Sequence, residues 1–225
     1  MQVIYEDNHI IVVVKPPNVL TQADNTGDDC LLEQVREYIR TKYNKPGNVY
    51  VGLLHRLDRP VGGLLVFAKT SKAASRLSDD IRNNNIDRKY LAVVHGKAPK
   101  QNVVESYLLK DTKTNMVKSY NKEVKGSKKA KLSYETLEFK NDMSLVEITL
   151  YTGRSHQIRV QMSSSGYPIY GDMRYGKQEK GNIALFCYKL TITHPTKKEK
   201  MEFTSKPPLN GAWREFADII EENIK

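Results

Sequence analysis

Short strand patterns dominate the chain from Lys89 onward, and this feature constrains the possible folds more than any other. Runs of β-branched, aromatic and other apolar residues predict strands there, at residues 90–95, 103–109, 131–139, 145–150 and 184–193. Helical patterns interrupt the strands at about 155–164 and again from about Ala212. This order of elements predicts an α+β fold around a mixed, largely antiparallel β-sheet with flanking helices.

The first third of the chain alternates strands with helices. Residues 10–15 predict a buried strand that ends at Pro16-Pro17, and residues 64–68 predict another strand. Asp28 or Asp29 is expected to cap one amphipathic helix and Ser71 a second. The inward positions predicted from helical periodicity are Leu32, Val35 and Ile39 in the first helix and Ala74, Leu77 and Ile81 in the second.

No linker or repeat divides the sequence, so residues 1–225 are expected to form a single domain. No apolar stretch approaches the roughly 20 residues that cross a bilayer, and the N-terminus lacks a signal-peptide pattern. These features predict a cytoplasmic protein with no membrane partner. The two cysteines and five histidines show no metal-ligand spacing, so no metal is expected.

Basic residues outnumber acidic ones, 36 Lys+Arg against 26 Asp+Glu, which gives a formal net charge of +10. Such a charge favours an anionic partner, and nucleic acid is the commonest large one; simple solubility is the alternative. Residues 110–131 hold eight lysines against Asp111 and Glu123. We expect part of this segment to be a flexible loop that contacts phosphates, whereas a solvated surface hairpin is the alternative.

A polar cluster lies in apolar surroundings at residues 52–64. Asp58 stands between Arg56 and Arg59, and these cations would keep its carboxylate ionised. Gly62 and Gly63 follow it and permit a tight turn. An ionised carboxylate where a loop enters a strand can act as a nucleophile or base, although a structural Asp–Arg pair would look the same in sequence.

Two further stretches combine polar groups with apolar positions. In a helix over residues 155–164, His156 and Arg159 would share one face while Ile158 shares another with Met162. Tyr90 enters a predicted strand, where it would either pack in the core or stack on a base.

These stretches resemble the signature motifs of the RluA-type family of pseudouridine synthases, and the resemblance covers nearly the whole chain in the family's order. The sequence departs from the family pattern at Val61-Gly62, where Thr-Ser is common, and at Gln161, where His is common. The matching motifs are Val3–Asn8, Val14–Pro17, His55-Arg56-Leu57-Asp58 through Gly63-Leu64 with Phe67–Thr70, Arg88–Ala92, Gly153–Arg159 and Gly166–Asp172.

The resemblance implies the pseudouridine synthase fold, a single catalytic domain with a central RNA-binding cleft. It implies an RNA uridine isomerase that flips specific uridines out of structured RNA, a ribosomal or transfer RNA stem-loop, and converts them to pseudouridine. No cofactor or metal is expected, and no obligate protein partner, so a monomer is the default. Many members carry an additional S4-type domain, which is not expected here.

The resemblance also assigns roles to individual residues. Asp58 matches the catalytic aspartate, Tyr90 would stack on the extruded uracil and help remove its C5 proton, and Arg159 would pair with Asp58. The residues expected to bind substrate or RNA are His55, Arg56, Arg154, His156, Ile158, Lys118, Lys122, Lys125, Lys128 and Lys129.

A catalytically inactive RNA-binding or RNA-chaperone module of the same fold is the alternative interpretation. The presence of Asp58, Tyr90 and Arg159 together argues against it. The two interpretations differ in their product, because only the enzyme would form pseudouridine.

Overall fold

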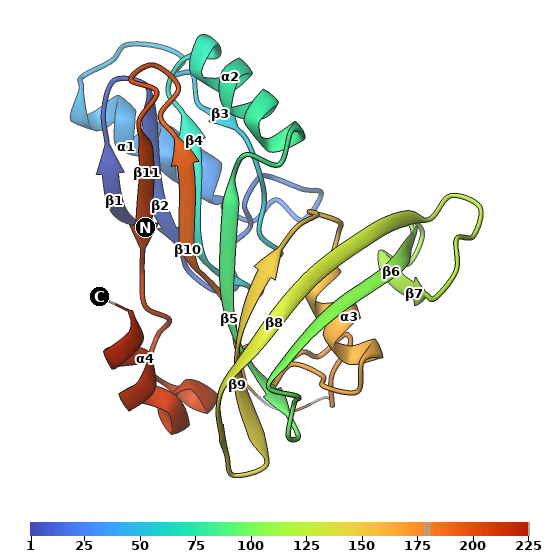
Figure 1. Cartoon of the computed structure of the whole chain (residues 1–225). Coiled ribbons are helices and arrows are strands. Elements are labelled where there is room, and N and C mark those ends of the chain that lie inside the picture. The colour runs from blue at the N-terminus through green and yellow to red at the C-terminus, as the bar shows by residue number, and fades with distance from the viewer. Residues whose placement is uncertain (178, 180, 225) are drawn as a thin grey trace. The chain divides into compact units, whose positions relative to one another are not determined.

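The computed structural model describes residues 1–177, 179 and 181–224, which form two compact units (Figure 1). The first unit comprises Met1–Ile86 and Cys187–Ser205, and the second comprises Asp87–Phe186 and the chain from Lys206 onward. Both units combine strands with helices, which confirms the predicted α+β class and the sheet flanked by helices. No helix among the described residues is both long and apolar enough to span a bilayer.

The first unit is built on a sheet whose central strands are completely buried. β2 is an Ile- and Val-rich run and β4 is an apolar run that begins with two glycines, and both have almost no exposed surface, as expected for strands covered on both faces. β2 ends at Lys15 because Pro16 has no amide hydrogen to donate to the sheet. The strand order is β1 (Gln2–Glu6), β2 (Ile10–Lys15), β4 (Gly62–Ala68) and β10 (Leu185–Thr193), with β3 (Gly52–Leu53) paired to β4 and β11 (Lys200–Thr204) paired to β10.

Two amphipathic helices, α1 (Leu31–Lys42) and α2 (Ser71–Arg82), belong to the same unit. Both were predicted from apolar periodicity, and both bury an apolar stripe as expected. The stripe is shifted by one residue at one position in each helix, since Leu31 and Ala73 are buried where Leu32 and Ala74 were expected.

Both predicted helix caps are wrong. Cys30 occupies the N-cap of α1 and makes no side-chain cap, while Asp29 accepts hydrogen bonds from the Cys30 amide and the Gln34 side chain instead. Thr70 caps α2, because its Oγ1 accepts from the Ala73 amide at 3.2 Å and leaves Ser71 as the first helical residue. Two adjacent candidate caps cannot be told apart by residue type alone.

The second unit is built on an antiparallel sheet. Val117, Leu108 and Ala130 of three different strands form a small core with Val160 of helix α3 (Gln157–Ser164). A helix was predicted from about Ala212. A short 3-10 segment (Gly211–Phe216) and α4 (Ala217–Asn223) lie there, and both bury apolar side chains. The strand order is β5 (Asp87–His95), β9 (Met143–Leu150), β8 (Lys128–Lys140), β6 (Gln101–Asp111) and β7 (Met116–Tyr120).

Half of the lysine-rich segment 110–131 is strand. It contains the end of β6, all of β7 and the start of β8, which are joined by a turn at residues 112–115 and a loop at residues 121–127. β7 pairs with β6 from Tyr107↔Tyr120 to Asp111↔Met116. We call β6, β7, β8 and this loop the arm. Strand β7 was not predicted, because lysine, serine and asparagine interrupt the apolar alternation on which strand prediction depends.

Buried acidic groups join the first strands of the first unit to its helices and its last hairpin. Glu6 accepts from the ammonium groups of Lys42 and Lys69, and Asp7 accepts from the buried His194 ring at 2.7 Å. Burial alone would raise the pKa of both carboxyls, but these hydrogen bonds lower each pKa to about 2. Each carboxyl therefore binds a proton less readily in the folded protein than in the unfolded chain.

The contribution of Glu6 and Asp7 to the stability of the protein is expected to be constant above about pH 5 and to fall as the pH drops towards 2, by about 2–3 kcal/mol for each residue. Urea unfolding at a series of pH values measures this. Glu6→Gln should flatten the curve, whereas Glu33→Gln on the exposed face of α1 should leave it unchanged. A wild-type curve with no slope below pH 4.5 would contradict the prediction.

Candidate active site

Asp58 lies half-buried in the loop between β3 and β4. The loop backbone is fixed on both sides of it. The Thr21 hydroxyl donates to the Leu57 carbonyl at 2.8 Å and accepts from the Leu57 amide at 3.3 Å, and the Val61 amide donates to the Asp58 carbonyl at 3.0 Å. The chain therefore holds this carboxylate on a defined backbone, as a positioned catalytic group requires.

A completely buried cation, Lys15, supports the same loop. Its Nζ donates to the carbonyl oxygens of Pro16 at 3.0 Å, Val19 at 2.6 Å and Arg59 at 2.9 Å, which uses all three ammonium hydrogens. Burial lowers the pKa of Lys15 to about 7, and the negative charge of Asp58 opposes that shift. Lys15 was not among the predicted site residues, although a lysine at the end of a β-branched strand is unusual.

Lys15→Met is expected to destabilise the protein by about 2–5 kcal/mol, because it leaves buried carbonyl oxygens without a donor. The midpoint of urea unfolding measures the loss. Lys113→Met, at an exposed position of the arm, is the control and should change stability by less than about 0.5 kcal/mol. A loss below about 1 kcal/mol in Lys15→Met would show that the three hydrogen bonds contribute little net stability.

The end of the loop needs a glycine at position 63. Gly63 has φ +127°, and a Cβ built on it would lie 2.4 Å from the backbone nitrogen of Cys187. Only glycine permits this approach of two strand backbones. The departure from the family pattern at Val61-Gly62 precedes this residue and leaves it in place; Val61 itself is buried.

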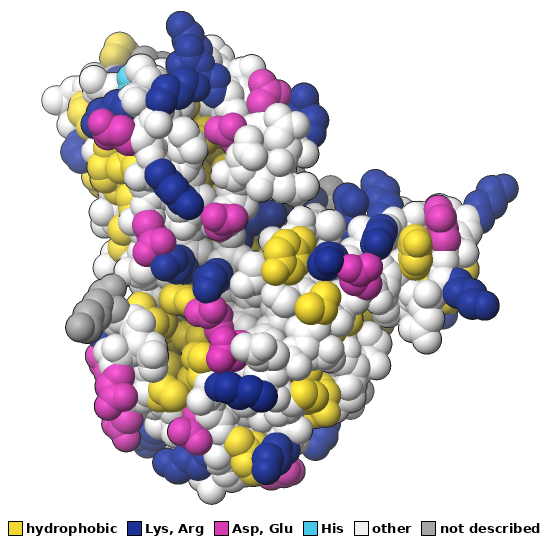
Figure 2. Space-filling view, in the orientation of Figure 1, with side chains coloured by type: hydrophobic (Ala, Val, Ile, Leu, Met, Phe, Trp, Pro, Cys, Tyr) yellow, Lys and Arg dark blue, Asp and Glu magenta, His cyan; other side chains and the backbone are white. Residues whose placement is uncertain are grey.

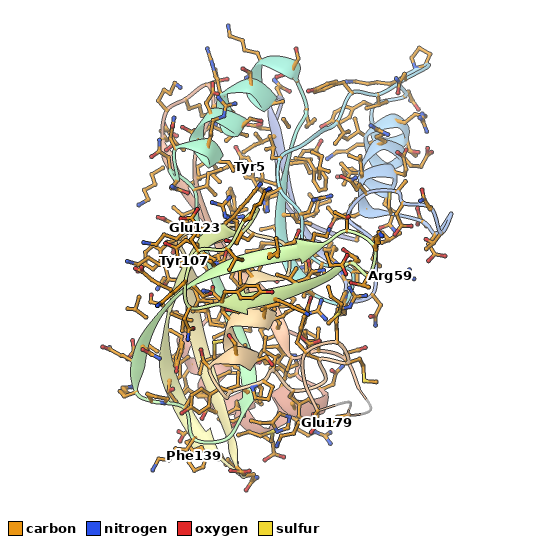
Figure 3. The ribbon with its side chains drawn as sticks, turned by 90° about the vertical axis from the view of Figure 1, so that its right-hand side faces the viewer. Tyr5, Arg59, Tyr107, Glu123, Phe139 and Glu179 are labelled. Atoms are coloured by element: carbon orange, nitrogen blue, oxygen red, sulfur yellow. The ribbon has the colours of Figure 1, made fainter. Side chains whose placement is uncertain are left out.

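The two arginines beside Asp58 do not both act as predicted. Arg59, labelled in Figure 3, pairs with Asp28 at 2.7 Å and donates to the Asn18 carbonyl, while Arg56 is exposed. The negative charge of Asp58 acts on the buried Lys15 in this unit. His55, expected to bind RNA, is buried with its Nε2 accepting from the Val66 amide at 3.4 Å.

Tyr90 and the α3 helix belong to the second unit. Tyr90 lies on β5 opposite Ile148 of β9 and is only 4% exposed. Ile158 on α3 is also buried, as a residue that lines an apolar wall would be. The structure thus places the predicted site residues in two groups, one on the β3–β4 loop and one around α3 and β5.

Arg159 on α3 forms a bidentate ion pair with Asp172. Its Nε donates to Oδ2 at 2.8 Å and its Nη2 to Oδ1 at 2.7 Å, and both side chains are buried. Burial would raise the pKa of Asp172, but Arg159 and the backbone amides of Arg174 and Tyr175 lower it. The guanidinium also lies over the Tyr175 ring, 5.2 Å from its centroid. Arg159 is thereby held in one orientation.

His156 joins the same network. The Tyr175 hydroxyl accepts from the Val117 amide at 3.0 Å and is hydrogen-bonded to His156 Nδ1 at 2.7 Å. His156 precedes α3 in the left-handed conformation with φ 53°. His156 and Arg159 therefore converge on Tyr175, as their spacing of three residues predicts. Sequence analysis included Asp172 in the resemblance but assigned it no role.

α3 is buried on nearly every side, from Gln157 to Met162, rather than presenting a solvated face. Gln157 closes its N-terminus, because its Oε1 accepts from the Thr152 hydroxyl and the Arg154 amide. Gln161, where the family commonly has histidine, donates to the Ser106 hydroxyl at 3.0 Å inside the arm. This departure from the family pattern is accommodated in the packing of the arm.

The remaining predicted RNA-binding residues lie on or beside the arm. Arg154 donates from Nε to the Lys129 carbonyl at 3.1 Å, so its side chain lies along β8. The five predicted lysines are exposed: Lys118, Lys122, Lys125, Lys128 and Lys129.

Comparison with known proteins finds relatives of one kind. The family model for RNA pseudouridylate synthase matches residues 9–164. The ribosomal large subunit pseudouridine synthase D of Zymomonas mobilis subsp. mobilis is 30% identical over 221 residues, 92% of this chain and 69% of that protein. The ribosomal large subunit pseudouridine synthase C of Buchnera aphidicola subsp. Acyrthosiphon pisum is 34% identical over 233 residues, 97% of this chain and 70% of that protein.

Solved structures show the same fold. Human RNA pseudouridylate synthase domain containing 4 aligns with a TM-score of 0.79 at 18% identity and covers 100% of this chain and 94% of its own. Human RNA pseudouridylate synthase domain containing 1 aligns with a TM-score of 0.75 at 20% identity and covers 98% of this chain.

Proposed function

This chain belongs to the RNA pseudouridylate synthase family, as a member of its RluA type, and we propose that it isomerises specific uridines of structured ribosomal RNA with Asp58 as its catalytic carboxylate. The observation that carries the proposal is Asp58 on a backbone fixed by Thr21 and Lys15, within the segment that the family model matches. That match includes parts of both units, which supports one catalytic domain. We propose that it acts as a cytoplasmic monomer.

The reaction moves atoms within one nucleotide. The bond from N1 of uracil to C1′ of the ribose breaks, the uracil turns, and a bond from C5 to C1′ forms. The C5 hydrogen leaves as a proton and N1 takes up a proton, so atoms and oxidation states balance and no second substrate is consumed. Asp58 would act at C1′ or at the base once the uridine has left its stack, a step that costs a few kcal/mol.

Tyr90 and Arg159 complete the proposed catalytic set. Tyr90 would stack on the extruded uracil and assist loss of the C5 proton, since an aromatic face suits an unstacked base. Arg159 would stabilise the charge of the Asp58 carboxylate, and its fixed guanidinium, held by Asp172, suits that purpose. Both assignments follow the resemblance of their motifs, residue by residue.

Ribosomal RNA is the proposed substrate because several relatives are named for the large ribosomal subunit. Transfer RNA is the second candidate. The test uses RNA labelled with tritium at uridine C5, from cells that lack this gene, separated into ribosomal and transfer fractions. We expect tritium release from the ribosomal fraction only. Release from transfer RNA alone would change the substrate, and RNA binding without release from either would support the inactive RNA-binding module.

A further inference from the structure

The two faces of the arm differ in character. Side chains alternate along each strand, so the cross-strand register assigns every residue to a face. One face packs against α3 through Leu108, Val117 and Ala130, and Ser106 accepts from Gln161 there. We call the opposite face the outer face. Its members, taken from the register, are Gln101, Val103, Glu105, Tyr107, Leu109 and Asp111 of β6, Met116, Lys118 and Tyr120 of β7, Lys129, Lys131, Ser133 and Glu135 of β8, and Glu147, Thr149 and Tyr151 at the end of β9.

The outer face is opposite to the proposed catalytic groups of this unit. Tyr90 pairs with Ile148, which pairs with Tyr134 of β8. Tyr134 is buried and lies two residues from Leu132, on the face that packs inward. The outer face therefore does not belong to the surface that carries Tyr90 and α3, and its side chains need a separate explanation.

Aromatic and cationic side chains are interleaved on the outer face, and large apolar groups are exposed there. Val103 is 56% exposed and Tyr151 is 46% exposed. Lys129 lies beside Tyr107 across the strands, and Lys118 is two residues before Tyr120 on β7, so both point to this face. Figure 2 shows hydrophobic and basic side chains alternating along the arm, and Figure 3 labels Tyr107 on it.

Contacts within the outer face hold these groups at its surface. The Lys131 ammonium lies 5.7 Å from the centroid of the Tyr151 ring, and the Tyr151 hydroxyl is 3.2 Å from the Ser133 hydroxyl. Glu105 bridges two lysines, at 3.1 Å from Lys129 and 2.8 Å from Lys131. The face thus presents the Tyr151 ring with an ammonium group over one side of it and further lysines close by.

The loop of residues 121–127 extends this surface. A Cβ built on Gly126 would lie 3.5 Å from Cδ1 of Leu109, so the loop lies over the distal end of the outer face. It brings the exposed Lys122 and Lys125 to that end. Asp111 and Glu135 lie towards the two ends of β6 and β8 on this face. Around the aromatic rings and the loop the lysines outnumber the carboxylates, Glu105 and Glu123, which makes an anionic partner the complementary one there.

We propose that the outer face binds a single-stranded segment of RNA, which stacks its bases on Tyr151 and Tyr107 and places its phosphates near Lys129 and Lys131. Interleaved aromatic and basic side chains are the pattern of sequence-tolerant single-strand binding. Protein interfaces are instead depleted in lysine. The inference deepens the proposed function, because it gives the RNA substrate a second contact surface, on the face of this sheet opposite to Tyr90 and α3.

The aromatic part of the proposal is tested by fluorescence anisotropy with a labelled oligouridylate of about ten nucleotides, a length within the site sizes of such surfaces. Tyr151→Ala should weaken binding roughly fivefold or more, whereas Tyr151→Phe should bind as the wild type does, because stacking needs the ring and not the hydroxyl. Tyr43→Ala is the matched control, since Tyr43 is also 46% exposed and is also surrounded by lysines, and its binding should be unchanged.

The charged part of the proposal predicts changes in both directions. Glu105→Gln should tighten binding, because it releases two lysines for phosphate, and misfolding does not produce a gain of affinity. Lys129→Gln combined with Lys131→Gln should weaken binding and lower the slope of log affinity against log salt by about 1 or more, at roughly 0.7 per single-strand phosphate contact. Lys189→Gln on β10 breaks a similar pair with Glu202 of β11, and it should change neither the affinity nor the salt slope.

Unchanged affinity in Tyr151→Ala and in the double lysine variant would overturn the inference, as would an equal loss in Tyr43→Ala. The measurement is of binding and does not depend on isomerisation. A protein that binds oligouridylate through this face but releases no tritium would keep the inference and remove the proposed function. A protein that releases tritium while its outer-face variants bind normally would keep the proposed function and remove the inference.

Discussion

Asp58→Asn is expected to abolish tritium release, with a loss of about four orders of magnitude or more in rate, as removal of an essential catalytic group commonly gives. The substitution keeps the size of the side chain and removes its charge and its capacity to act as a nucleophile or base. RNA affinity and unfolding should stay close to those of the wild type. Single-turnover tritium release at saturating enzyme separates this chemical defect from a binding defect.

The structure explains why this variant should fold. The backbone at Asp58 is held by the Thr21 hydroxyl on Leu57, by the Lys15 ammonium on the Arg59 carbonyl and by its own turn to Val61. None of these contacts uses the Asp58 carboxylate. These backbone contacts remain available in Asp58→Asn, so the variant is expected to fold, and the unfolding measurement checks this.

Asp28→Asn is the matched control for Asp58→Asn. Asp28 is an exposed carboxylate of the same unit and pairs with Arg59, the residue that follows Asp58. It should retain wild-type turnover, because an exposed ion pair contributes about 0–1 kcal/mol. Turnover near wild type in Asp58→Asn would remove Asp58 from the mechanism, and equal losses in both variants would point to the position of the loop rather than to its carboxylate.

Local patterns in the sequence predicted the parts of the fold that depend on local physics. The buried strand of residues 10–15 and the stripe of Val35 and Ile39 in α1 follow from apolar periodicity, which the chain itself displays. The caps of α1 and α2 were missed, since the choice between neighbouring polar residues depends on how the chain enters the helix.

The contacts around the candidate site could not be derived from periodicity. Asp172 lies 13 residues from Arg159, and Lys15 lies 44 residues from Arg59, so only the folded chain brings each pair together. Their type was a usable signal: an acid in a glycine-rich turn and a lysine that ends a β-branched strand are unusual when they are buried. The partners of such groups are determined by topology, which residue spacing does not encode.

Asp172→Asn is expected to destabilise the protein by about 3–5 kcal/mol, because it leaves the buried Arg159 guanidinium without its charged partner. Asparagine fills the same volume, so the loss would report on charge rather than on a cavity. The urea midpoint and its slope measure the change. Asp79→Asn, which breaks the exposed pair with Arg82, is the control and should cost no more than about 1 kcal/mol.

A second substitution separates the charge of Arg159 from its packing. Arg159→Met in the Asp172→Asn background removes the unpaired cation, so the double variant should recover part of the stability that the single variant lost. Additive losses would show that the two residues stabilise the protein independently and would contradict the pairing argument. Both variants should lose isomerisation if Arg159 acts in catalysis, since the double variant regains stability without regaining the guanidinium. Recovery of stability together with recovery of turnover would instead limit the Arg159–Asp172 pair to a structural role.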